Sequence, residues 1–162
     1  MVRAPRNRTI ALSERERDSY KHKLLKVKSP VHLGKILNRV INQDVFEVVD
    51  RLPSKFVDLL FIDPPYNLFK TFNTRSFMQM SVYHYMEWME GWLQKMVRLL
   101  KPTSSIYICG DWRSSAAIHL IGEKYFKVRN RIIFEREKGR GAKRNWKNNL
   151  SLILISEPTR PY

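Results

Sequence analysis

Four consecutive residues, Asp63-Pro64-Pro65-Tyr66, end an apolar run and combine hydrogen-bond acceptors with an aromatic ring. Proline has no backbone N–H and cannot continue a central strand, so one interpretation of Pro64 and Pro65 is a stop signal. The chemical interpretation starts from the carboxylate of Asp63, a proline carbonyl beside it and the face of Tyr66. Two acceptors next to a ring face suit a planar base that carries an exocyclic amine. Open α/β sheets bind ligands at the carboxyl ends of their strands, where this segment would lie.

The surrounding pattern predicts the elements that position this segment. Strands and helices alternate after residue 56, which predicts an α/β fold with a mostly parallel sheet and helices on its faces. Two apolar runs near the end have no helical pattern between them, so we expect an antiparallel hairpin at one edge. The expected strands are 38–42, 56–62, 105–112, 128–137 and 150–156, and the expected helices are 45–52, with Phe46, Val49 and Leu52 inward, 85–99 and 114–126.

Composition bounds the size and the partners of the protein. The chain has 162 residues, 43 % of them hydrophobic, which is enough for the core of one domain. Residues 1–33 mix both charge signs with few apolar residues, so we expect a charged arm there and one globular domain over 34–162. Thirty Lys and Arg residues against fifteen Asp and Glu give a net charge of +15. This excess indicates a polyanionic partner, and nucleic acid is the leading candidate.

Cysteine usage and the N-terminus indicate a compartment. Cys109 is the single cysteine of the sequence, so neither a disulfide framework nor a cysteine zinc site can form, and we expect no metal site. The N-terminus is charged and has no apolar signal core, and no apolar run approaches the length of a membrane span. These features predict a cytoplasmic protein.

Several segments in order resemble one family. They are "INQD", "LPSKFVDLLFIDPPYNL", a Tyr- and Trp-rich helix ending "LLKP", "SIYICGDWRSSAAI" and "RNRIIFEREKGRGAKRNWKNN". Together they look like a restriction-modification DNA amino-methyltransferase with a Rossmann-like sheet, from the subgroup in which the DPPY segment precedes the S-adenosylmethionine loop. The resemblance covers about residues 38–149, and its strength lies in the order of the blocks.

The resemblance implies roles for individual residues. Asp63 and a carbonyl of the Pro64-Pro65 segment would accept both hydrogens of the adenine N6 amine, and Tyr66 would stack on the flipped base. Phe134 resembles the aromatic residue that closes the other face of the base, although strands are rich in aromatic residues anyway. Asp44 falls where relatives present a carboxylate to S-adenosylmethionine, together with Asp63. Asp44 could equally cap the helix 45–52 that follows it, and Asp111 could cap the helix 114–126.

The loop between the last two strands is the candidate DNA contact. Cations, glycines and a tryptophan there suit phosphate contacts and stacking, whereas a solvated hairpin loop is the simpler alternative. The predicted DNA-binding residues are Lys138, Arg140, Lys143, Arg144, Trp146 and Lys147.

The sequence also departs from the resemblance. Relatives carry a glycine-rich cofactor loop after the recognition segment, and the six glycines here do not provide one, so the fold is expected to be incomplete on that side. The main hypothesis is an S-adenosylmethionine-dependent DNA adenine-N6 methyltransferase that acts on duplex DNA, with a second polypeptide supplying the missing loop. The alternatives are a non-catalytic DNA-binding remnant, one half of a split enzyme, or a cytosine-N4 methyltransferase.

Overall fold

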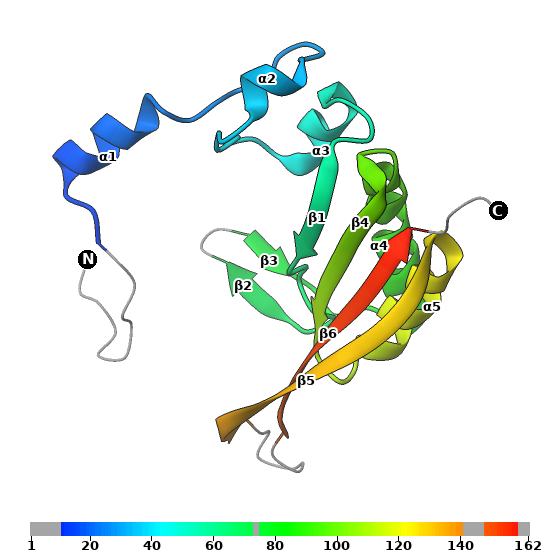
Figure 1. Ribbon diagram of the computed structural model, residues 1–162. Helices are drawn as coiled ribbons and strands as arrows, with labels where there is room; N and C mark the ends of the chain where they lie inside the picture. Colours follow the sequence, from blue (N-terminus) through cyan, green and yellow to red (C-terminus); the bar gives the residue numbers. More distant parts are fainter. Residues whose placement is uncertain (1–10, 73–74, 141–147, 159–162) are drawn as a thin grey trace. The chain divides into compact units, whose positions relative to one another are not determined.

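The computed structural model describes residues 11–72, 75–140 and 148–158, and at 72, 75, 136–140 and 148–149 it describes the backbone alone (Figure 1). The chain forms two compact units, Met1–Leu52 and Pro53–Tyr162. The sequence placed the start of the globular part near residue 34, whereas the division between the units falls between Leu52 and Pro53.

The first unit consists of short helices. Ser13 and Glu16 form a reciprocal capping box at the start of the first helix. The Arg51 guanidinium donates to the Val27 carbonyl at 2.8 Å, and the Gln43 amide bonds to the backbone of the same residue. The helices are α1 (Glu14–Lys21), α2 (Leu33–Ile36), α3 (Val45–Val48) and the 3-10 turn η1 (Val49–Arg51).

Two expectations for this unit are wrong. The predicted strand 38–42 is absent from the described residues, where Ile41 forms only an isolated bridge with Leu25. Asn38 has a φ of 57°, and this left-handed residue interrupts the extended backbone that a strand requires. The predicted helix is present as α3 and η1, with Val49 buried as expected. Phe46 does not face inward, because 47 % of it is exposed.

The second unit is built on a mixed sheet. Its described strands lie in the order β1-β4-β6-β5, with β1 and β4 parallel and the other two pairs antiparallel. The predicted edge hairpin is confirmed as β5 and β6. A separate antiparallel hairpin, β2–β3, follows β1. The elements are β1 (Val57–Ile62), β2 (Lys70–Phe72), β3 (Arg75–Phe77), α4 (Val82–Val97), β4 (Leu100–Gly110), α5 (Ser115–Tyr125), β5 (Phe126–Arg140) and β6 (Asn148–Pro158).

The two faces of this sheet differ. Helix α5 packs on β4, β5 and β6, and α4 packs on α5, so the helices lie on one side (Figure 1). Ile106, Ile108 and Ile118 are buried in this layer. On the other face, Phe61 stacks on Tyr107 with ring centroids 6.3 Å apart, yet 59 % of Phe61 remains exposed. One face of the sheet therefore carries the core, and the other presents apolar side chains to its surroundings.

Candidate active site

The Asp63–Tyr66 segment follows β1 directly and lies at the carboxyl end of the parallel β1–β4 pair. Ile62, the last residue of β1, is paired with Ile108, so β4 ends just beyond at Gly110. Two parallel strands thus deliver an aspartate each, Asp63 and Asp111, to the same edge of the sheet. This edge is where open α/β sheets place their ligands.

One of the two proline carbonyls, that of Pro65, accepts a hydrogen bond from a buried side chain. Tyr85 of α4 is fully buried, and its hydroxyl donates to the carbonyl oxygen of Pro65 at 3.0 Å. Among the described residues, no hydrogen bond to the carbonyl of Pro64 is found. Asp63 is exposed, whereas Pro64 is buried and Tyr66 is half-buried. The acceptors that remain for a ligand are the Asp63 carboxylate and the Pro64 carbonyl.

Tyr66 interacts directly with Asp63. Burial raises the pKa of the Tyr66 phenol above its ordinary value, and a hydrogen bond to the Asp63 carboxylate and the negative charge of that group raise it further. The phenol therefore stays protonated beside the carboxylate. Stacking of the Tyr66 ring on a base stays a prediction.

Asp111 and Ser114 form a closed pair after β4. The Asp111 Oδ1 atom accepts from the Ser114 backbone N–H at 2.8 Å and from the Ser114 hydroxyl at 2.6 Å. Only 8 % of Asp111 and 1 % of Ser114 are exposed. The carboxylate thus satisfies the backbone donor of Ser114, which is itself the N-cap residue of α5, so the expectation that Asp111 caps this helix is wrong.

Asn67 closes the segment on its other side. Its side-chain amide donates to the Met80 carbonyl at 2.8 Å, and its side-chain oxygen accepts from the Met80 N–H at the same distance. These two hydrogen bonds join the two ends of segment 67–80, which contains β2 and β3. The Asp63–Tyr66 segment is therefore held by the Tyr85 bond at Pro65 and by the Asn67 bonds that follow it.

The structure does not gather all of the predicted site residues. Asp44 lies in the first unit, where its Oδ1 atom accepts from the Phe46 N–H at 2.9 Å as the cap of α3. This bond uses one carboxylate oxygen, and the cofactor role of Asp44 stays a prediction. Phe134 lies in β5 opposite Ser151 and is 48 % exposed. Strand β5 is three strands from β1, roughly 14 Å at the usual spacing, so the role of Phe134 at the base also stays a prediction.

The predicted DNA contacts fall largely outside what the structure shows. Residues 143–147, which include Lys143, Arg144, Trp146 and Lys147, lie outside the described residues. Lys138 and Arg140 belong to β5 by their backbone alone. Their DNA-binding role stays a prediction.

Sequence reasoning missed the residues that hold the segment in place. Tyr85 lies in the predicted helix 85–99, and the helical pattern says nothing of its hydroxyl. No spacing rule would have found the bond, because its acceptor lies twenty residues earlier in the chain. Asn67 follows the DPPY segment immediately, yet its partner lies thirteen residues later.

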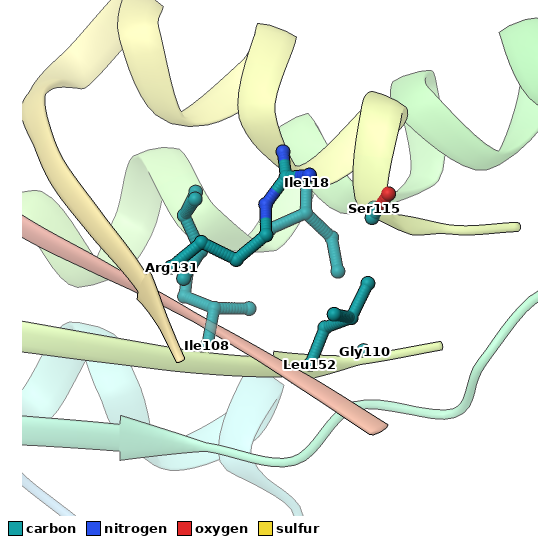
Figure 2. A pocket seen from close by; sticks show the side chains of 7 residues that line it. Ile108, Gly110, Ser115, Ile118, Arg131 and Leu152 are labelled. Carbon is teal, nitrogen blue, oxygen red and sulfur yellow. The ribbon is translucent and has the colours of Figure 1, made fainter. Parts of the chain in front are cut away.

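A small pocket lies elsewhere, between α5 and the sheet (Figure 2). Its lining is aliphatic apart from Ser115 and Arg131, and it includes no residue of the Asp63–Tyr66 segment. Over the described part of the chain, no group of His, Cys, Asp and Glu side chains could hold a metal ion. No helix within the same residues has the length and apolarity needed to cross a membrane.

The fold defines a class of protein, namely an α/β protein whose Asp63–Tyr66 segment lies at the carboxyl end of β1. The model of the DNA methylase family matches residues 57–162, which is more than half of the chain. The chain belongs to the DNA methylase family.

Individual relatives agree with this assignment. The chain is 27 % identical over 127 residues to the DNA adenine methyltransferase YhdJ of Escherichia coli strain K12, covering 78 % of this chain and 43 % of that protein. It is 27 % identical over 128 residues to the type II methyltransferase M.BamHI of Bacillus amyloliquefaciens, covering 77 % and 30 %. The fold resembles the putative DNA modification methylase TTHA0409 of Thermus thermophilus, solved with S-adenosyl-L-methionine, with a TM-score of 0.55, 21 % identity and coverage of 74 % and 52 %. The chain thus spans less than half the length of the two curated relatives.

Proposed function

We propose that this chain carries the catalytic segment of an S-adenosylmethionine-dependent DNA adenine-N6 methyltransferase. The single observation that carries the proposal is the pair of acceptors after β1, the Asp63 carboxylate and the Pro64 carbonyl, with the Tyr66 ring beside them. Family membership supports methyl transfer to DNA, and the similarity to an enzyme named for adenine favours the N6 amine over the cytosine-N4 amine.

The two acceptors suit the chemistry of an exocyclic amine. The N6 lone pair of adenine is delocalised into the ring, so the nitrogen is a poor nucleophile. Acceptance of one N–H by Asp63 and the other by Pro64 would localise the pair and aim it away from the sheet edge. The catalytic contribution would be positioning and electrostatic stabilisation, without a covalent enzyme intermediate.

The described residues fit only part of a cofactor site. S-adenosylmethionine, when bound, supplies an electrophilic methyl group on a sulfonium. The second unit would contribute the Asp63 carboxylate. No glycine in the described part of the chain has a positive φ, so a tight glycine turn of the kind that cradles such a cofactor is not found there.

We further propose that a second polypeptide supplies the rest of the pocket. The apolar face of the sheet that carries Leu59 and Phe61, both more than half exposed, is the surface that it would cover. Duplex DNA would be held by the basic loop and by the net charge of +15. A cytoplasmic location fits a DNA substrate.

The test is a methyl-transfer assay with tritiated S-adenosylmethionine and duplex DNA. The purified chain is assayed alone and with a second polypeptide that carries a glycine-rich strand-to-helix turn, and digested DNA is analysed for the modified base. We expect N6-methyladenine from the mixture and little transfer by the chain alone. Formation of N4-methylcytosine would overturn the choice of base. DNA binding without transfer in the mixture would favour the non-catalytic remnant.

A further inference from the structure

We propose that Tyr85 is a positioning residue for methyl transfer, and that its hydroxyl holds the catalytic segment in place through the Pro65 carbonyl. This inference rests on the proposed function. It concerns a residue that does not touch the base.

The first step is the bond between α4 and the catalytic segment. The Tyr85 hydroxyl donates to the Pro65 carbonyl oxygen at 3.0 Å. The Tyr85 ring has little freedom, because it is fully buried and packs against Trp88 and Phe77 with centroids 5.5 and 6.5 Å away. The hydroxyl is therefore presented from a rigid side chain, which fixes the orientation of the peptide that follows Pro65.

The second step is the protonation of this hydroxyl. Burial raises the pKa of the Tyr85 phenol, and the negative charge of Asp111 raises it further. Tyr85 thus remains a hydroxyl donor to the Pro65 carbonyl.

The third step is the consequence for the reaction. Because the Pro65 carbonyl is committed to Tyr85, the Pro64 carbonyl is the backbone acceptor left for the amine. Because proline fixes φ, ψ is the free rotation at Pro65, and the Tyr85 bond restrains this rotation and with it the direction of the Pro65 carbonyl. A loss of this anchor would loosen the segment that carries the acceptor without removing it, and a displacement of this kind lowers the rate of a reaction that depends on positioning.

The experiment compares Tyr85→Phe with Tyr125→Phe. Both substitutions remove one phenolic oxygen, and the Tyr125 hydroxyl bonds to Glu90 of the same helix α4 at 2.9 Å, away from the catalytic segment. Hydrogen exchange of the amides of residues 66–69 is measured on the purified chain, which needs no activity. We expect roughly tenfold faster exchange in Tyr85→Phe and no local change in Tyr125→Phe.

Kinetics of the transfer-competent form separate positioning from folding. We expect Tyr85→Phe to lower kcat by roughly tenfold with the KM for DNA within about twofold of the unsubstituted chain, and Tyr125→Phe to leave both unchanged.

The outcomes distinguish this inference from the proposed function. Unchanged exchange at residues 66–69 in Tyr85→Phe, or an unchanged kcat in an active preparation, would overturn the positioning role. An unsubstituted chain that transfers no methyl group in any mixture would overturn the proposed function, while the exchange measurement would still report on the anchor.

Discussion

Two aspartates, Asp63 and Asp111, follow two neighbouring parallel strands, and their surroundings are opposite. Asp63 comes after β1, is exposed, and interacts with the phenol of Tyr66. Asp111 comes after β4, is buried, and is bonded twice to Ser114. The same local pattern, an apolar strand that ends in a carboxylate, produces an exposed carboxylate at one position and a buried one, bonded to the Ser114 N–H, at the other.

The residues that follow each aspartate explain the difference. Pro64 and Pro65 have no N–H groups, so the backbone cannot capture the Asp63 carboxylate and begin a helix. After Asp111 the backbone turns into α5, and the N–H of Ser114 lies within reach of the carboxylate. Because of the two prolines, the residues that follow Asp63 offer its carboxylate no backbone N–H, and the carboxylate stays at the end of the sheet where a ligand would bind.

The largest expected effect is on catalysis and comes from Asp63. Asp63→Ala should lower methyl transfer by roughly a hundredfold or more, because one of the two amine acceptors is lost, while DNA affinity should change little. A tritiated-methyl assay beside a binding titration measures both. Asp111→Asn, which keeps an oxygen for Ser114, is the matched control and should retain most of the activity. Full transfer by Asp63→Ala would end the proposed distinction between the two carboxylates.

The second effect is on stability and comes from Asp111. Asp111→Ala should lower the free energy of unfolding by about 1–3 kcal/mol, because the buried donors of Ser114 lose their partner. Asp58→Ala is the control: Asp58 forms an exposed salt bridge with Lys101 at 2.7 Å, and its loss should cost less than about 1 kcal/mol. Urea unfolding measures both variants. Equal losses in the free energy of unfolding would mean that the buried Asp111–Ser114 pair stabilises the fold no more than an exposed salt bridge does.

The third effect depends on pH and reports on the burial of the Tyr66 phenol beside Asp63. The pKa of the Tyr66 phenol is raised in the folded protein above its ordinary value of 10.0. The folded state then keeps its proton where the unfolded state loses it, so this contribution to stability is complete below about pH 10 and declines as the pH rises further. Tyr66→Phe should reduce the alkaline loss of stability, with a slope change of at most about 1.4 kcal/mol per pH unit. Urea unfolding between pH 8 and pH 11 (roughly the titration range of a phenol) tests it, and an unchanged slope in Tyr66→Phe would contradict it.

The smallest effect uses Cys109 as a reporter of the Asp63 charge. Burial raises the pKa of the Cys109 thiol, and the negative charge of Asp63 raises it further. Asp63→Asn should therefore lower this pKa and speed alkylation by iodoacetamide, by roughly twofold at constant pH. Asp58→Asn removes a charge elsewhere and should leave the rate unchanged. Equal rates in all three proteins would show that the Asp63 carboxylate does not act on the end of β4.

Much of the fold of the second unit could be predicted from the sequence. The strand at 56–62, the helix over 85–99 and the final hairpin carry strong periodicity, and all three are present. The strand at 38–42 could not be excluded, because the left-handed φ of Asn38 leaves no mark on the apolar pattern. The division between Leu52 and Pro53 also has no compositional signal, because both sides are rich in apolar residues.

By itself the sequence determined the chemical inventory of the site. Asp63 at the end of an apolar strand, two prolines without donors and the Tyr66 ring are local features, and local steric and hydrogen-bonding rules suffice to interpret them. Only the tertiary structure decided which proline carbonyl is committed, that Asp111 is buried, and that Phe134 lies three strands away from β1. These properties depend on contacts between α4, β1 and β4 and on the order of strands in the sheet. They join residues distant in the chain, which no local pattern can encode.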